Sequence, residues 1–288
     1  MNIKILTGIA LAALLGASTT GAWANELMPS FATVPTGWTV DRYAPDSFAN
    51  VGNYQGATNV LGIGIGPNGA AANRPAGQQS SFYSTQGEGY GITGGAGSSL
   101  SAALYVPTSW ATPSQGARRT GMWGVMTDGL GNVTDYPIID FTNVGTGTAD
   151  LNSSGNQDSF VGFRVWSEAA NGGNGGWIDL ASAVNYGGWN ELSMQFTGTD
   201  FQYFINGVDV LDVAAGSGST TFSNVLMEAV NFNGDTYFPN VDASAYTAYW
   251  SNTPVPEPSS LALAVPGLAA LGFLLWRKNA RSANGAAA

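Results

Sequence analysis

Apolar and polar residues alternate along much of the chain between residues 59 and 250. In residues 61–65 the apolar members Leu61, Ile63 and Ile65 are separated by glycines, and residues 100–106 repeat the same period. Side chains of a β-strand point alternately to opposite faces, so a period of two predicts half-buried strands. Residues 25–252 show no sustained helical period. The pattern therefore predicts an all-β fold of closely spaced antiparallel strands, in a sandwich or a barrel.

The best-defined pair of strands lies in residues 189–213. Leu192, Met194 and Phe196 share one face of the first strand, and Trp189 falls on the other face with the polar residues 191, 193 and 195. Further on, the dipeptide at positions 206 and 207 is Asn-Gly, between two strand-like runs. Asn and Gly accept the positive φ angles of a tight type I′ turn, so this dipeptide predicts a hairpin.

Both ends of the chain differ from this pattern. Residues 1–24 have a cation at Lys4, a short apolar run and a small-residue finish in which Ala22 and Ala24 flank Trp23. This order predicts a signal peptide cut by signal peptidase after Ala24. The alternative is an uncleaved membrane helix. It is disfavoured because the apolar run is shorter than the roughly 20 residues needed to span a bilayer.

Residues 259–276 carry no charge, and Arg277 and Lys278 follow directly. A run of this length meets the lower limit for a membrane-spanning helix, and flanking cations keep its end in the cytoplasm. The alternative, a buried core helix, does not fit a terminal segment that follows a proline-rich linker. The chain thus divides into a signal peptide (1–24), an irregular glycine-rich part of the sandwich (25–80), a β-sandwich (81–252), a linker (253–258), a transmembrane helix (259–276) and a basic cytoplasmic tail (277–288).

Composition narrows the chemistry of the exported part. Residues 25–257 hold five arginines and no lysine against nineteen carboxylates, a net charge of −14. Such a surface repels nucleic acid and anionic lipid, and suits neutral glycans, cations or plain solubility. The chain has no cysteine and no histidine. Disulfides, Ser-His-Asp catalysis, and zinc or copper sites are therefore not expected.

The hairpin region resembles a known fold family. It has Trp189 at the start of a strand, the aromatic residues Phe196 and Tyr203, the turn glycine Gly198 and the Asn206-Gly207 turn. These residues occupy the places seen in concanavalin A-like (laminin-G-like) jelly rolls. The resemblance covers roughly residues 80–250 and implies an antiparallel jelly-roll β-sandwich with Trp189 in its core. An unrelated sandwich with a similar hairpin is the alternative.

Some jelly rolls of this class hydrolyse glycans with two carboxylates on one strand face, in a Glu-x-Asp-x-Glu pattern. This pattern is absent from the chain. Asp209 and Asp212 are three residues apart and Asp135 and Asp140 are five apart, so the members of each pair would point to opposite faces of a strand. From these spacings we expect a protein that is not an enzyme.

Two kinds of binding residue remain as candidates. Asp128, Asn132 and Asp135 offer oxygen ligands in one loop, and such ligands make calcium the one candidate cofactor. The alternative is that these side chains shape turns. Trp166 and Trp177 present flat apolar faces for sugar rings, and Trp177 is expected to be exposed because it follows a Gly-Asn-Gly sequence. Burial of both indoles in the core is the alternative.

The last thirty residues closely resemble the PEP-CTERM sorting signal of Gram-negative bacteria. Pro256, Glu257 and Pro258 precede the apolar run, and Arg277 and Lys278 close it. The resemblance implies transient anchoring in the inner membrane, recognition by an exosortase, cleavage near the triplet, and transfer to the cell surface or extracellular matrix. It also associates the chain with exopolysaccharide and biofilm.

Together these features predict an exported protein that binds or organises extracellular polysaccharide. A structural surface protein without glycan specificity is the second hypothesis, and a glycan-active hydrolase is the third.

Overall fold

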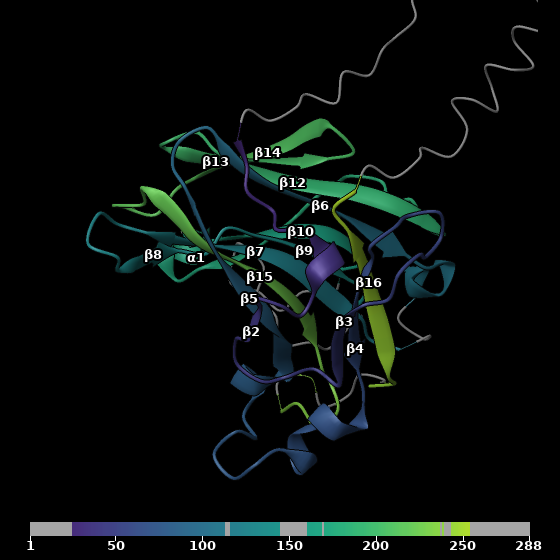
Figure 1. Cartoon of the computed structure of the whole chain (residues 1–288). Coiled ribbons are helices and arrows are strands. Elements are labelled where there is room, and N and C mark those ends of the chain that lie inside the picture. Colours follow the sequence, from purple (N-terminus) through teal and green to yellow (C-terminus); the bar gives the residue numbers. More distant parts are fainter. Residues whose placement is uncertain are drawn as a thin grey trace, which may run out of the picture.

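In a computed structural model, the described residues are 25–112, 116–144, 160–168, 170–236, 238 and 243–253. They form two eight-stranded sheets that pack face to face (Figure 1). The first, sheet A, runs in the order β14 (Val208–Ala214), β13 (Asp200–Ile205), β12 (Gly188–Phe196), β6 (Ser98–Val106), β16 (Tyr246–Ser251), β4 (Leu61–Ile65) and β3 (Ser47–Asn50), and β1 (Asn25–Glu26) pairs with β6.

The second, sheet B, runs in the order β11 (Gly176–Asp179), β10 (Gly162–Ser167), β9 (Ile138–Thr142), β7 (Arg119–Thr127), β15 (Thr221–Val230), β5 (Thr85–Gly94) and β2 (Thr39–Val40). Strand β8 (Val133–Asp135) pairs with β7. All pairs are antiparallel in the described part except β1–β6, which is parallel. The helical elements are short: η1 (Phe31–Thr33), η2 (Pro67–Gly69), η3 (Ala71–Asn73), η4 (Ser81–Ser84), η5 (Thr108–Ala111) and α1 (Ala170–Gly173).

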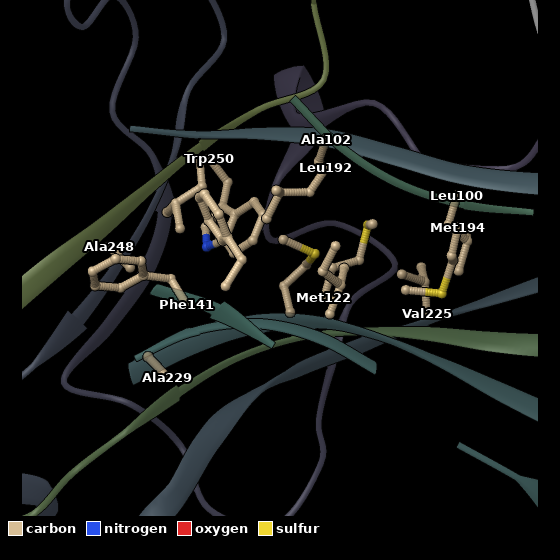
Figure 2. Packing of buried hydrophobic residues seen from close by; sticks show 14 of the residues in the cluster. Leu100, Ala102, Met122, Phe141, Leu192, Met194, Val225, Ala229, Ala248 and Trp250 are labelled. Atoms are coloured by element: carbon tan, nitrogen blue, oxygen red, sulfur yellow. The ribbon is translucent and has the colours of Figure 1, made fainter. Parts of the chain in front are cut away.

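One hydrophobic core fills the space between the sheets. Figure 2 shows Leu192 and Met194 of sheet A facing Met122 and Val225 of sheet B. Trp250 is fully buried in this core, and its indole N–H donates a hydrogen bond of 3.0 Å to the hydroxyl of Thr120. Because each strand gives one face to the core, its other face is left for the outer surface of its sheet.

The predicted all-β antiparallel sandwich is confirmed. The run at 61–65 forms β4, and the Asn-Gly dipeptide joins β13 to β14 with φ angles of 51° at Asn206 and 74° at Gly207. Residues 25–80 contain more structure than the sequence indicated, because β1, β2 and β3 extend the two sheets there.

The two terminal segments fall outside the described residues, so the signal peptide with Ala22 and Ala24, and the segment 259–276, remain predictions. Among the residues that the structure describes, no helix is both long and apolar enough to cross a bilayer.

Candidate glycan-binding face

The outer face of sheet B carries a row of charged residues that come from separate strands. Strand register places Glu228 of β15 beside Gly121 of β7, then Asp140 of β9, Arg164 of β10 and Asp179 of β11. These residues are distant in sequence, yet each lies directly opposite the next in the sheet. Neighbouring strands are about 4.8 Å apart, so the row brings carboxylates and a guanidinium within interaction range.

Two glycines make room for the carboxylates in this row. A Cβ atom added at Gly121 would collide with Oδ1 of Asp140, and one added at Gly87 of β5 would collide with the carboxylate of Glu228 and the carbonyl of Met227. The side chains of Glu228 and Asp140 therefore extend over bare backbone. Any larger residue at either glycine would displace a carboxylate.

Glu228 is the carboxyl group of the row in the least favourable environment for a charge. It is 1% exposed, and neither carboxyl oxygen has a hydrogen-bond partner of ordinary geometry among the described residues. Burial raises the pKa of this carboxyl well above its usual range, and repulsion from Asp41 and then Asp140 adds to the effect. Arg42 opposes that shift of the pKa. The carboxyl is therefore held in its protonated form at pH values where most glutamates are ionised.

Asp140 has a different environment. Its Oδ2 accepts a 2.7 Å charged hydrogen bond from Nε of Arg119, and this pair is nearly buried. The guanidiniums of Arg119 and Arg164 lie 4.4 and 4.1 Å from the ring centroid of Trp177. One indole thus packs against two cations, an arrangement that stabilises both through the negative face of the ring.

An aromatic row runs beside the charged row on the same face. Leu226, Trp123, Ile138, Trp166 and Trp177 are successive cross-strand partners. Their contacts form a small apolar cluster outside the main core.

Trp166 and Trp177 meet edge to face, with ring centroids 5.3 Å apart. The expectation that Trp177 is exposed is wrong: the side chain is 4% exposed, because β11 pairs with β10 and carries the indole over the two arginines. Trp166 is partly exposed, and its indole N–H donates a 3.0 Å hydrogen bond to the exposed carboxylate of Glu168.

At the other edge of the face, Arg42 lies between two rings. Its guanidinium carbon is 4.6 Å from the ring centroid of Phe82 and 4.9 Å from that of Trp123. Phe82 is 57% exposed. We call Phe82, Arg42, Trp123 and Trp166 the sheet B strip. Phe82 and Arg42 were not predicted from the sequence, because strand register and the approach of residues 39–43 cannot be seen in a linear pattern.

The structure does not bring the three candidate calcium ligands together. Asp128 accepts hydrogen bonds from the backbone of Leu130 and Asn132 and from the Asn132 side chain, and these bonds hold the pKa of Asp128 below its usual range. The carboxylate of Asp135 instead accepts from the backbone of Tyr136 and Gly216, and burial raises its pKa.

Asp128 and Asn132 therefore shape a turn, as the alternative interpretation held. The described part of the chain contains no cluster of three acidic residues suited to a metal ion.

Comparison with solved structures finds several similar sandwiches. One is a pseudo β-1,3-glucanase and immunostimulatory antigen of Mycobacterium tuberculosis, with 16% identity, a TM-score of 0.42, and coverage of 77% of this chain and 92% of that one. Another is a glycosyl hydrolase family 16 protein of Mycobacterium smegmatis, with 15% identity, a TM-score of 0.42, and coverage of 77% and 96%. A third is a β-1,3-glucanase of Mycobacterium marinum, with 17% identity, a TM-score of 0.40, and coverage of 77% and 93%. At these scores the activities named for those proteins are not carried over to this chain. Among the curated proteins, none matches.

The expectation that the protein is not an enzyme is wrong. Sandwiches similar to this chain include glycoside hydrolases, so the fold gives no ground for excluding catalysis. There is also a physical reason. Spacings within single strands do not show which carboxylates meet in a sheet, and sheet B brings Glu228 and Asp140 together from different strands.

The C-terminal segment gives the clearest relationship. Residues 254–279 match the family model of the PEP-CTERM protein-sorting motif, which includes Pro256, Glu257, Pro258, Arg277 and Lys278. These residues lie outside the described part, so the motif is established by sequence. The chain therefore joins an antiparallel jelly-roll-like β-sandwich to a PEP-CTERM protein-sorting motif.

Proposed function

We propose that the protein is exported, anchored briefly in the inner membrane, processed by an exosortase, and placed at the cell surface or matrix, where it binds neutral polysaccharide. The sorting motif at 254–279 supports the route. The observation that supports the ligand is the sheet B strip, in which aromatic side chains on rigid strands and one adjoining helix line a single outer face.

The chemistry of the strip suits sugar rings. A pyranose ring has a face of C–H groups that packs on the negative face of an aromatic ring, and its hydroxyls need polar partners. Phe82 offers an exposed ring and Trp166 a partly exposed one, while Glu168 and Arg42 offer an acceptor and donors beside them. Two strand spacings, or about 10 Å, separate Trp123 of β7 from Trp166 of β10, so an extended glycan chain could contact several of these groups.

The acidic surface of the protein favours neutral glycans over anionic ones. Arg74, Arg118 and Arg164 are at most 7% exposed, and the side chains of Arg42 and Arg119 are 22% and 12% exposed. The charged residues of the described part that are classed as exposed are all acidic: Glu26, Asp41, Asp46, Glu168, Glu191, Asp209 and Asp212. Uronic-acid or sulfated polysaccharides would be repelled by such a surface.

Affinity electrophoresis of the processed protein, collected from an exosortase-competent bacterium, tests the ligand. A neutral β-glucan or galactan in the gel is expected to retard the wild type, and alginate is not. Trp166→Ala should weaken retardation about tenfold or more, as loss of an aromatic anchor does. Leu130→Ala is the matched control, because Leu130 is an 88% exposed apolar residue in the turn between β7 and β8 and belongs neither to the strip nor to the apolar cluster beside it. Migration unaffected by every neutral glycan would refute glycan binding and favour a purely structural surface protein.

Intact-mass analysis tests the route separately. In cells with exosortase the secreted chain is expected to begin at Asn25 and to end near Pro258. Glu257→Gln should leave a precursor that retains the apolar segment. A mass that still includes Trp276 in exosortase-competent cells would contradict the proposed processing.

A second candidate function is glycan cleavage, which one observation favours. Burial raises the pKa of the Glu228 carboxyl well above its usual range, whereas Asp140 forms an ion pair with Arg119, so two carboxyl groups in different environments lie across Gly121 from each other. Glycosidases use such a division of labour. Release of reducing ends from the bound glycan, abolished by Glu228→Gln and kept by Asp209→Asn, would support it.

A further inference from the structure

A second cluster of aromatic side chains lies on the opposite outer face of the sandwich. Trp189 of β12, Tyr105 of β6 and Tyr249 of β16 are direct cross-strand partners on the outer side of sheet A. Tyr54, from the loop at 51–60 between β3 and β4, packs against all three. We call these four residues the sheet A platform. Each of them is partly exposed.

The rings of the platform are in close contact. Tyr54 stacks on Tyr249 with centroids 3.8 Å apart and ring planes 18° apart. Tyr105 meets Tyr54 and Trp189 edge to face, at centroid distances of 5.4 and 5.5 Å. Three of the four rings carry a phenol hydroxyl, and burial, and then Tyr249 and Tyr105, raise the pKa of the Tyr54 phenol. The platform therefore combines apolar rings with a concentration of hydroxyls.

The loop that supplies Tyr54 is tied together and to the sheet by hydrogen bonds. Tyr54 and Ala57 form a two-residue bridge, and the turn between them takes positive φ at Gln55 and Gly56. The carbonyl of Gln55 accepts a 3.0 Å hydrogen bond from the indole N–H of Trp189. A ligand that binds rings already fixed in place loses little conformational entropy in doing so.

Core packing does not account for the platform. In the same strands Leu104, Leu192 and Trp250 point inward and supply the buried contacts between the sheets. The platform residues point the opposite way. Four partly exposed aromatic side chains are gathered on one sheet face. A contiguous apolar patch in contact with water is typical of a binding surface. Hydroxyl-bearing rings, rather than aliphatic side chains, suit a ligand that is itself amphipathic.

We infer that the sheet A platform is a second binding site for a neutral polysaccharide chain, so that one protein molecule bridges two glycan chains. This inference rests on the proposed function, because it takes the sheet B strip as the first site. The two sites lie on outer faces that point away from each other, with the core between them, so the geometry favours two ligand chains over one. The acidic surface excludes anionic polysaccharide here as well, since Glu191 is exposed two residues from Trp189.

Bridging of beads coated with neutral polysaccharide, followed by light scattering, tests the inference. The wild-type processed protein is expected to aggregate the beads. The variants Tyr54→Ala and Trp189→Phe should still bind single beads. The protein concentration that they need to bridge beads should be at least about tenfold higher than for the wild type. Trp166→Ala should lose bridging equally, because it removes the opposite site, and Leu130→Ala should behave as wild type. Thermal melts of each variant exclude unfolding as the cause.

Each other outcome identifies which proposal fails. Binding without bridging, or bridging unaffected by Tyr54→Ala and Trp189→Phe, overturns the second site and leaves the proposed function intact. Failure to bind beads at all overturns both. Sedimentation without glycan adds a further check: a dimer that Tyr54→Ala dissociates would show that a second copy of this chain occupies the platform, which also overturns the inference.

Discussion

The substitution Glu228→Gln tests the charged row of sheet B most directly. Glutamine has nearly the shape of protonated glutamic acid but cannot ionise. In the folded protein the pKa of Glu228 is raised well above 4.5, because the side chain is buried beside Asp41 and Asp140. In the unfolded chain the same carboxyl is solvated and ionises in its usual range. The folded state therefore binds the proton more tightly than the unfolded state does.

The sign and size of the effect follow from proton linkage. A raised folded-state pKa contributes stability that is fully present below about pH 4.5 and is lost as pH rises through the folded-state pKa. Inside this window the wild type loses about 1.4 kcal/mol of unfolding free energy per pH unit from Glu228 alone. For a domain of this size, that equals roughly 3–6 °C in Tm per unit. The glutamine variant lacks this contribution, so it should be the more stable protein at neutral pH.

Urea unfolding of the processed protein at half-unit steps from pH 4 to pH 8 measures the effect. Burial also raises the pKa of Glu26, Glu88 and Asp135, but these groups are common to both proteins. The difference between the two stability curves therefore isolates Glu228. Asp41→Asn is a second test variant. Removing the repelling charge should lower the pKa of Glu228, so the pH range over which the unfolding free energy falls should end at a lower pH.

A constant difference between wild type and Glu228→Gln across this range would refute the reasoning. It would mean that Glu228 ionises at the same pH in both states, and hence that its carboxyl is solvated in the folded protein. The candidate role of Glu228 as a proton donor would fail with it.

Three further substitutions test the packing, each by urea unfolding. Gly121→Ala places a methyl group on Oδ1 of Asp140 and should cost about 1–3 kcal/mol; no loss would mean that this carboxylate can move aside. Gly207→Ala forces an L-residue into φ 74° and should cost about 1 kcal/mol. Trp250→Ala empties a fully buried site and removes the hydrogen bond that the Thr120 hydroxyl accepts, with an expected loss of about 3–5 kcal/mol. A smaller loss would show that the core collapses around the cavity.

The sequence was most informative where structure is local. Alternation at 61–65 and the Asn206-Gly207 turn identified β4 and the β13–β14 hairpin, because side-chain direction and positive φ depend on near neighbours. Alternation was also more reliable than resemblance at Trp189. The period placed this residue on the polar face of its strand, whereas the jelly-roll resemblance implied the core, and the structure leaves it partly exposed.

The candidate sites were not accessible to the same reasoning. Asp140 and Glu228 lie 88 residues apart, and their approach depends on the register of β7 against both β9 and β15. Trp177 shows the same limit. Its position after a Gly-Asn-Gly sequence indicated exposure. Pairing of β11 with β10 instead buries the indole against the guanidinium groups of two arginines.

The sequence by itself determined that this chain carries a sorting motif and folds into antiparallel strands, because both are written in short contiguous segments. Tertiary structure decided which side chains meet: the acid pair across Gly121, the strip on sheet B and the platform on sheet A. Each of these depends on register between strands distant in sequence. Such register is selected by burial of the shared core face, and the composition of the outer faces follows from it.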